Sequence, residues 1–340
     1  MRMPKKIVLI DSDFHTLADD HEALLMVAGH HRSGSLELLG LTTVTGNTWA
    51  RTGADHAEEA IRRAKLDGVP VAEGTGQPLL HRQSDFAHRS RLYGAAFGGA
   101  WGNADLLEKQ PSPRPEAISG GRHAVLFLID QIRRSQAPVT LLAIGPLTNI
   151  ALALRLAPDI RDNIARIVCM GGAFFVPGNV TPSAEFNWWF DPEAAAIVLE
   201  EDLDLLIVPL DATDKVVLDI DRYRRWSNEF ANHDVFMRFH KPKFDSVFEK
   251  DNGFTLPVWD ALAAACLLDE SIVSKQESYW VSVDCSEGPS YGRVVSYSDA
   301  NEFNLDAPKR QRARIVLEAD CVRFWALYES LVFSAATEAD

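Results

Sequence analysis

Short apolar runs alternate along the chain with longer stretches whose apolar positions recur at helical spacing. The runs cover residues 7–10, 36–46, 138–145, 165–172 and 203–211. The helical patterns cover residues 21–31, 51–68, 123–135, 146–156 and 191–202. The runs are rich in branched side chains and apolar on both faces, as strands are when helices cover both sides of their sheet. The pattern predicts an α/β fold with an open, mainly parallel sheet flanked by helices.

No repeat, low-complexity tract or Pro/Ser-rich linker divides the chain, so residues 1–340 are predicted to form a single domain. Residues 75–120, which are polar, Gly-rich and aromatic, and residues from about 212 to 260 are expected to be long excursions over one end of the sheet. Ligands of such sheets bind where the carboxyl ends of the strands meet the loops. We therefore expect the active site at that end.

The composition narrows the classes of partner. A net charge of -14 argues against nucleic acid, because a phosphate backbone requires a basic face. A small neutral substrate, or a cation that offsets carboxylates, fits better. The longest apolar runs are far shorter than a membrane span or a signal sequence. Four scattered cysteines without a CxxC pair are typical of a reducing compartment. We expect a cytoplasmic protein with no membrane partner.

Four aspartates follow the first apolar run within ten residues, at the start of a helical pattern: Asp11, Asp13, Asp19 and Asp20. A single carboxylate there would cap the helix by accepting hydrogen bonds from its free N–H groups. Four crowded carboxylates repel one another and raise each other's pKa. A hard cation such as Ca²⁺ or Mg²⁺, bound through oxygen ligands, removes that repulsion. The cluster predicts a metal site but leaves the reaction open.

Several further blocks occur in a fixed order with this cluster: LLGLTTVTGN, LLAIGPLTNIALAL, MGG, GNVTPSAEFNWWFDPEAA and WDALA. Together they resemble the nucleoside hydrolases, the inosine–uridine-preferring type and its relatives, over residues 7 to about 265. The resemblance implies an open α/β fold with one bound Ca²⁺. It also implies hydrolysis of the N-glycosidic bond of a ribonucleoside, by attack of a metal-activated water, to give free base and ribose.

The resemblance implies a role for individual residues. The metal would be held by Asp13, Asp20, the backbone carbonyl of Ile144 and Asp260, and Asp13 would also take the proton of the attacking water. The ribose would be held by Asp19, Asn47, Met170, Asn179, Glu185 and Asn187, with Phe186 nearby. Three of these residues also have plain structural alternatives: Asn179 as a turn residue, Asn187 as a helix-entry residue and Met170 as part of the core.

The sequence departs from the family pattern in the first motif. Five residues, FHTLA, separate Asp13 from Asp19, where the pattern has three. The assignment of Asp19 or Asp20 as the metal ligand is therefore open. His15, inside the longer loop, either reaches the pocket or faces solvent.

The second departure concerns the leaving base. The inosine–uridine-preferring type has a histidine before the last metal aspartate, whereas this chain has Trp259, as the purine-specific members do. Those members stack the purine between aromatic rings, so the resemblance implies a purine-preferring enzyme of purine salvage. The second ring is expected from residues 88–103, with Trp101 first, then Tyr93 or Phe97. Alternatively, Trp259 is a core residue, or the second ring is Trp188 or Trp189.

Other readings stay open. A haloacid-dehalogenase-type phosphatase also begins with a strand and DxD, and would use Asp11 as its nucleophile, but the later Asn-rich block would then have no role. A non-catalytic ribose- or nucleoside-binding member of the fold is a further alternative. So is a hydrolase of pyrimidine or modified ribonucleosides. The resemblance also implies a homodimer or homotetramer.

Overall fold

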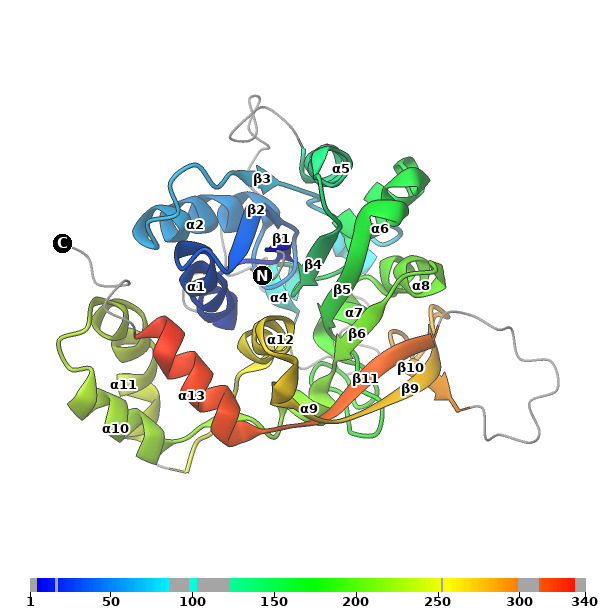
Figure 1. The fold of residues 1–340 in the computed structure, drawn as a ribbon. Helices are drawn as coiled ribbons and strands as arrows, with labels where there is room; N and C mark the ends of the chain where they lie inside the picture. Colours follow the sequence, from blue (N-terminus) through cyan, green and yellow to red (C-terminus); the bar gives the residue numbers. More distant parts are fainter. Residues whose placement is uncertain are drawn as a thin grey trace.

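The computed structural model describes residues 5–15, 18–85, 98–102, 123–251, 253–298 and 312–333. Within these residues one large sheet contains β1 (Lys6–Ser12), β2 (Leu36–Thr43), β3 (Val71–Glu73), β4 (Val139–Ala143), β5 (Ile164–Met170), β6 (Leu205–Val208), β9 (Val273–Val283), β10 (Val294–Tyr297) and β11 (Arg312–Ala319). The strand order is β10-β9-β11-β6-β5-β4-β1-β2-β3 (Figure 1). All neighbours from β11 to β3 pair in parallel, and only the pairs that β9 makes are antiparallel. The predicted mainly parallel sheet is confirmed.

Helices cover both faces of the sheet. The helices are α1 (Asp19–Arg32), α2 (Ala50–Arg63), α4 (Gly99–Gly102), α5 (Ala124–Arg134), α6 (Thr148–Leu156), α7 (Phe186–Phe190), α8 (Pro192–Glu200), α9 (Leu210–Thr213), α10 (Ile220–Glu229), α11 (Lys241–Lys250), α12 (Trp259–Leu268) and α13 (Cys321–Val332). Figure 1 shows α1, α2, α12 and α13 on one side and α5, α6 and α8 on the other. Val8 and Ile10 of β1 point into the first layer and Leu9 into the second, as strand alternation requires.

The excursion between β6 and α12 packs beside the first layer. It contains α9, α10, α11, the short antiparallel pair β7 (Val217–Leu218) and β8 (Leu256–Pro257), and a π-helical turn, η2 (Phe236–His240). Trp226 of α10 stacks on Tyr328 of α13 at 5.5 Å between ring centroids. Two 3-10 turns, η1 (Pro158–Asn163) and η3 (Glu270–Ile272), precede β5 and β9. Among the described residues, no helix is both long and apolar enough to cross a bilayer.

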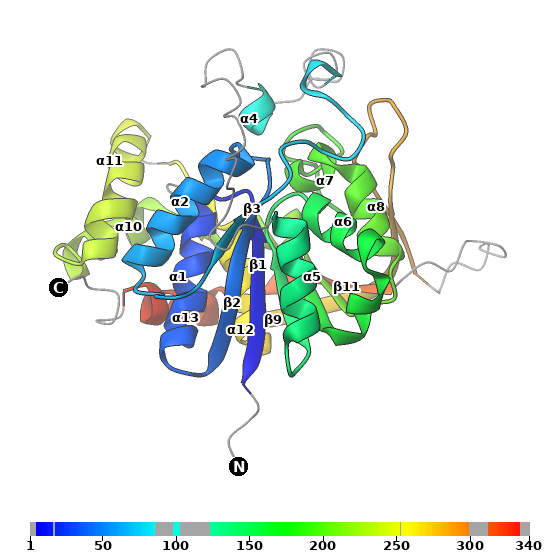
Figure 2. The same cartoon turned by 90° about the horizontal axis from the view of Figure 1, so that it is seen from above.

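The strand order reverses direction between β1 and β4. From β1 the chain moves one way to β2 and β3, and then returns to the other side of β1 to form β4, β5 and β6. The loops that follow β1 and β4 therefore leave in opposite directions and open a crevice, the usual ligand site of such sheets. The two strand ends are fixed at this point, because Ile144 N donates to Asp11 O at 2.9 Å. Figure 2 shows the sheet from above, with α4 beyond its upper end.

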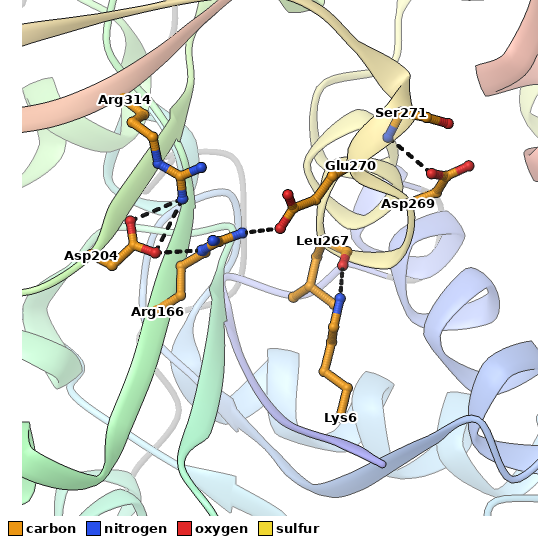
Figure 3. A network of polar contacts seen from close by, with 8 residues as sticks. All are labelled: Lys6, Arg166, Asp204, Leu267, Asp269, Glu270, Ser271 and Arg314. Atoms are coloured by element: carbon orange, nitrogen blue, oxygen red, sulfur yellow. Dashed lines mark hydrogen bonds and ion pairs between the residues drawn. The ribbon is translucent and has the colours of Figure 1, made fainter. Parts of the chain in front are cut away.

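The opposite end of the sheet carries an ion-pair network (Figure 3). Arg166 Nε lies 2.7 Å from Asp204 Oδ2, and Arg166 Nη1 lies 2.5 Å from Glu270 Oε1. Arg314 Nη2 of β11 lies 2.9 Å from Asp204 Oδ1. The network ties the start of β5 to the start of β6, to β11 and to η3. Partly exposed ion pairs of this kind contribute only about 0–1 kcal/mol each to the free energy of folding. Their role is local: they hold this end of the sheet together.

Candidate active site

A cavity of about 510 Å³ lies at the carboxyl ends of β1, β4 and β5. Its volume is within the range of small-molecule sites. Ten of the residues predicted for the site line it: Asp19, Asn47, Ile144, Met170, Asn179, Glu185, Phe186, Asn187, Trp259 and Asp260. Ala18, Val180, Lys243, Leu256 and Pro257 complete the lining. The structure thus gathers segments that lie more than 200 residues apart in the sequence around one space.

Asp13 lies buried directly after β1, and neither it nor Asp20 is among the residues that line the cavity. Its Oδ2 accepts a hydrogen bond from the backbone N of Asn47 at 2.6 Å, and among the described residues its Oδ1 has no partner. Two glycines let neighbouring loops approach this closely. A Cβ on Gly46 would lie 2.2 Å from Asp13 Oδ2, and one on Gly145 would lie 2.6 Å from Asp13 N. The loops after β2 and β4 therefore close directly on Asp13.

Asp20 and Asp19 begin α1, and Asp260 lies in the first turn of α12. Asp20 Oδ1 accepts from Ser12 Oγ at 2.5 Å, while its buried Oδ2 has no partner among the described residues. Asp19 Oδ2 accepts from Asp260 N at 2.9 Å. The three carboxylates each offer an oxygen within 4.8 Å of the others. The structure thus brings Asp19 and Asp20 to the same cluster, and both helix N-termini favour negative charge there.

The electrostatics of the cluster fit a hard cation. Burial, and then the charge of Asp20, raise the pKa of Asp13 well above its usual range. Burial and the charge of Asp19 raise the pKa of Asp20 to about 7. Burial, and then Asp19 and Asp20, raise the pKa of Asp260 well above its usual range. The buried carboxylate oxygens without partners and the mutual repulsion are both relieved by a divalent ion with oxygen ligands.

Asp11 lies behind this cluster and not in the cavity. It is 2% exposed, and its Oδ1 accepts from Thr42 Oγ1 at 2.5 Å and from Asn149 Nδ2 at 2.8 Å. Burial raises its pKa to about 7. Its role is to support the end of β1.

Glu185 organises the wall opposite α1. It is the N-cap of α7, where its Oε1 accepts from Asn187 N at 2.7 Å. Its Oε2 accepts from Gly172 N at 2.9 Å and from Trp188 N at 3.2 Å. Burial raises the pKa of Glu185 to about 7. This carboxylate therefore has backbone partners, and a sugar hydroxyl is not needed to explain its burial.

The amides beside Glu185 are also fixed by the chain. Asn187 Nδ2 donates to Met170 O at 3.3 Å, which joins α7 to the end of β5. Asn179 Oδ1 accepts from Phe186 N at 2.9 Å. Asn179 is therefore more than a turn residue, and Met170, although buried, reaches the cavity. The amide groups are held in place before any ligand arrives.

The aromatic residues are arranged differently from the prediction. Trp259 lines the cavity, and its Nε1 donates to Asp214 Oδ1 at 3.2 Å. Trp101 is only 3% exposed, lies outside the lining and packs against Phe190 at 5.4 Å between ring centroids. The structure does not place Trp101 opposite Trp259, because its indole is buried in an aromatic cluster. Ala100 N donates to Gly46 O at 2.9 Å and holds α4 in that place.

The structure describes some of the remaining aromatic candidates and not others. Tyr93 and Phe97 lie outside the described residues. Trp188 and Trp189 are buried within α7, at 1% and 3% exposure, and do not line the cavity. His15 meets His56 edge to face at 5.2 Å between ring centroids and does not line the cavity.

Sequence reasoning missed several lining residues. Lys243 of α11 and the pair Leu256–Pro257 of β8 come from the excursion between β6 and α12. The excursion was expected to reach this end of the sheet, but no motif marks which of its residues face inward. The unexpected basic residue, Lys243, lines a cavity whose other charged lining groups are the carboxylates of Asp19, Glu185 and Asp260.

Several known proteins are similar to this chain over nearly its whole length. The family model for inosine-uridine preferring nucleoside hydrolases matches residues 8–326. A pyrimidine-specific ribonucleoside hydrolase, RihB of Escherichia coli, is 32% identical over 335 residues, which are 97% of this chain and 98% of that protein. The structure of a purine-preferring ribonucleoside hydrolase from Gardnerella vaginalis has a TM-score of 0.73 at 25% identity, covering 98% and 99% of the two chains. A plant nucleoside hydrolase has a TM-score of 0.77 at 24% identity, covering 97% and 100%, and it supports the fold alone.

Proposed function

The chain belongs to the nucleoside hydrolase family and is a glycosidase that acts on ribonucleosides; from this premise we propose that it depends on Ca²⁺ and prefers purine bases. The single observation that carries the metal requirement is the buried carboxylate cluster beside a cavity of nucleoside size, where one oxygen each of Asp13 and Asp20 has no partner among the described residues. Asp13, Asp20, Asp260 and the carbonyl of Ile144 would hold the ion. Oxygen ligands and the absence of histidine or cysteine from this set favour Ca²⁺ over softer metals.

When bound, the ion would orient the ribose hydroxyls and lower the pKa of the attacking water. Asp13 would take the proton of that water, because its Oδ1 has no partner in the part of the chain that the structure describes, while its Oδ2 is fixed by Asn47 N. As the C1′–N bond breaks, the sugar gains positive charge, which the surrounding carboxylates stabilise. Asp19, Asn47, Asn179 and the Glu185–Asn187 pair would hold the ribose.

The preference for purines rests on Trp259. Its ring lines the cavity next to the apolar pair Leu256–Pro257, and its indole N–H is taken by Asp214, so the face of the ring is the part available to a base. A purine offers the larger surface for stacking. An indole N–H is not a useful acid, so stacking is the contribution that this position can make.

Pyrimidine ribonucleosides are the second candidate substrates. They are favoured by the 32% identity to a pyrimidine-specific hydrolase over nearly the full length of both chains. A pyrimidine also fits the volume of the cavity.

A substrate panel distinguishes these proposals. Release of ribose from inosine, guanosine, adenosine, uridine, cytidine and 2′-deoxyinosine is measured with added Ca²⁺ and after treatment with a chelator. We expect the highest kcat/KM for inosine or guanosine, little activity on the deoxynucleoside, loss of activity with chelator and its return with Ca²⁺. A maximum on uridine or cytidine would replace the purine proposal by the pyrimidine one. Full activity after complete metal removal would overturn the metal requirement, and binding without any base release would indicate the non-catalytic alternative.

We further propose that residues 1–340 form one domain and that the protein is a homodimer or homotetramer engaged in purine salvage. Light scattering coupled to gel filtration measures the assembly. A monomer across the concentration range would contradict it.

A further inference from the structure

Lys243 is a basic side chain at an acidic site. It is the third residue of α11 and lines the cavity together with Leu256, Pro257 and Trp259. Its side chain is 20% exposed. Within the described lining it is the only basic residue, and the other charged lining groups are carboxylates.

The surrounding structure holds this lysine in place. Lys243 Nζ lies 3.9 Å from Oε1 of Glu22, a buried residue of α1, and 4.9 Å from the ring centroid of Phe244. The same Glu22 oxygen lies 3.8 Å from His240 Nε2, which is 2.8 Å from Tyr328 OH of α13. The π-helical turn η2 directly precedes α11, and such turns are frequent at functional sites. The contacts from α1 and α13 therefore hold α11 at the cavity, where Lys243 is a lining residue and its Nζ lies near Glu22.

The cavity walls differ in chemistry. The carboxylates and amides come from the loops after β1 and β2, from the loop before α7 and from α7, and from Asp260 of α12. Lys243, Leu256, Pro257 and Trp259, from α11, β8 and the start of α12, contribute one cation and three largely apolar residues to the lining. A cation next to the ribose would oppose the positive charge that develops on the sugar. The departing base, in contrast, gains negative charge, and a lysine stabilises that charge.

We propose that Lys243 contacts the leaving base and stabilises its negative charge in the transition state; this inference rests on the proposed nucleoside hydrolase reaction. The electron pair of the C1′–N bond passes to the base, and the water oxygen forms the new bond to C1′. The water proton goes to Asp13. Lys243 Nζ donates a hydrogen bond to an acceptor atom of the base, which takes its own proton from solvent as it leaves.

The test separates help to the leaving group from a structural role. Lys243→Met removes the charge and the donor but keeps the length of the side chain, and Lys243→Arg keeps a cationic donor. Lys250→Met is the matched control, because Lys250 lies on the same helix, is exposed and is outside the cavity. Each variant is assayed on inosine, on uridine and on p-nitrophenyl β-D-ribofuranoside, whose nitrophenolate departs without assistance.

We expect Lys243→Met to lower kcat on the better nucleoside by roughly 100-fold, the usual effect of losing one transition-state donor. Activity on the nitrophenyl riboside should stay within about twofold, which also shows that the variant is folded, and Lys243→Arg should recover part of the nucleoside activity. Equal losses on all substrates, or no loss on nucleosides, would overturn the role of Lys243 and leave the proposed function standing. If the unaltered enzyme cleaves no riboside, the proposed function fails, and the inference fails with it.

Discussion

At the scale of single residues, the buried carboxylates decide what the site can do. Asp13, Asp20 and Asp260 are enclosed with few protein donors, and burial is the first cause that raises the pKa of each. Such an arrangement is unfavourable unless a cation completes it. The charge cluster that the sequence places after the first strand is therefore the best predicted part of the molecule.

Asp13→Ala tests the assignment of the general base. Loss of a positioned base, together with one metal ligand, should lower kcat by at least about 100-fold on any ribonucleoside. Steady-state kinetics with saturating Ca²⁺ measures the effect, and isothermal titration should show weakened Ca²⁺ binding. The exposed Asp202 provides the control, and Asp202→Ala should leave both values unchanged. Wild-type kcat in Asp13→Ala would remove Asp13 from the mechanism.

Trp259→Ala tests the stacking of the base. Stacking on an aromatic ring contributes about 1–3 kcal/mol per base, so kcat/KM for inosine should fall by roughly 5- to 150-fold. The indole is only partly buried, so Tm should change by a few degrees at most. Trp280→Ala, on β9 and away from the cavity, is the control. Unchanged kcat/KM in Trp259→Ala would show that the ring does not meet the base.

The residues that sequence reasoning misplaced or missed share a physical cause. Trp101 was expected in the cavity as the second ring from residues 88–103, but a large indole gains more by burial against Phe190. Lys243 was missed because its place depends on how α11 packs on α1 and α13. Short motifs do not carry such information, since it is set by tertiary contacts.

At the scale of elements, the caps of short helices connect the strands to the site. Asp191 is the N-cap of α8 and is fully buried. Its Oδ1 accepts from Ala194 N, and its Oδ2 accepts from Thr148 Oγ1 of α6 at 2.6 Å and from Leu79 N at 3.0 Å. The carboxylate of Asp191 thus joins α8, α6 and the segment after β3. Asp191 also directly follows α7, the helix that Glu185 caps.

Asp191→Ala should therefore cost more than the loss of an ordinary cap. Three donors lose their partner at a buried position, so we expect the free energy of unfolding to fall by about 2–4 kcal/mol. Asp219→Ala is the matched control, because Asp219 caps α10 by accepting from Arg222 N, its one donor among the residues that the structure describes, and its loss should cost about 1 kcal/mol. Urea denaturation measures both. Equal losses in the two variants would contradict the view of Asp191 as a junction.

At the scale of the whole molecule, the mainly parallel sheet was predictable from the sequence, but the order of its strands and its far edge were not. The five apolar runs correspond to β1, β2, β4, β5 and β6, because strands buried on both faces are apolar throughout. β9 contains the polar stretch Ser274–Ser278, which is exposed, so no apolar run marks it. Its antiparallel pairing with β10 and β11 follows from contacts between distant segments.

The charge of the buried acids should make stability depend on pH and metal together. Asp11, Asp20 and Glu185 have pKa values raised to about 7, so without metal the folded state keeps protons that the unfolded chain has lost. Metal-free stability should therefore fall as pH rises from 6.5 to 8, by roughly 1 kcal/mol per group. Below pH 6.5 two buried histidines, His21 and His240, oppose this trend, because burial lowers the pKa of each to about 3.

Urea unfolding at pH 6.5 and pH 8, before and after removal of divalent ions, measures this linkage. Saturating Ca²⁺ should remove the share of the fall that comes from Asp20, the proposed metal ligand among the three, and add stability that is greater at pH 8, where the carboxylates are already ionised. Metal-free stability that rises over this interval would contradict the assignment of raised pKa values.

The hydrogen bond from Asp260 N to Asp19 Oδ2 joins residues that are 241 positions apart. On the ribosome, the chain acquires Asp13 and Asp20 almost at once, but Asp260 emerges only after about three quarters of the 340 residues have been made. A nascent chain thus carries an incomplete acidic cluster through most of its synthesis, and a product that terminates before α12 lacks one of the proposed metal ligands altogether. Release of nucleobases would therefore be restricted to chains that have been translated past α12.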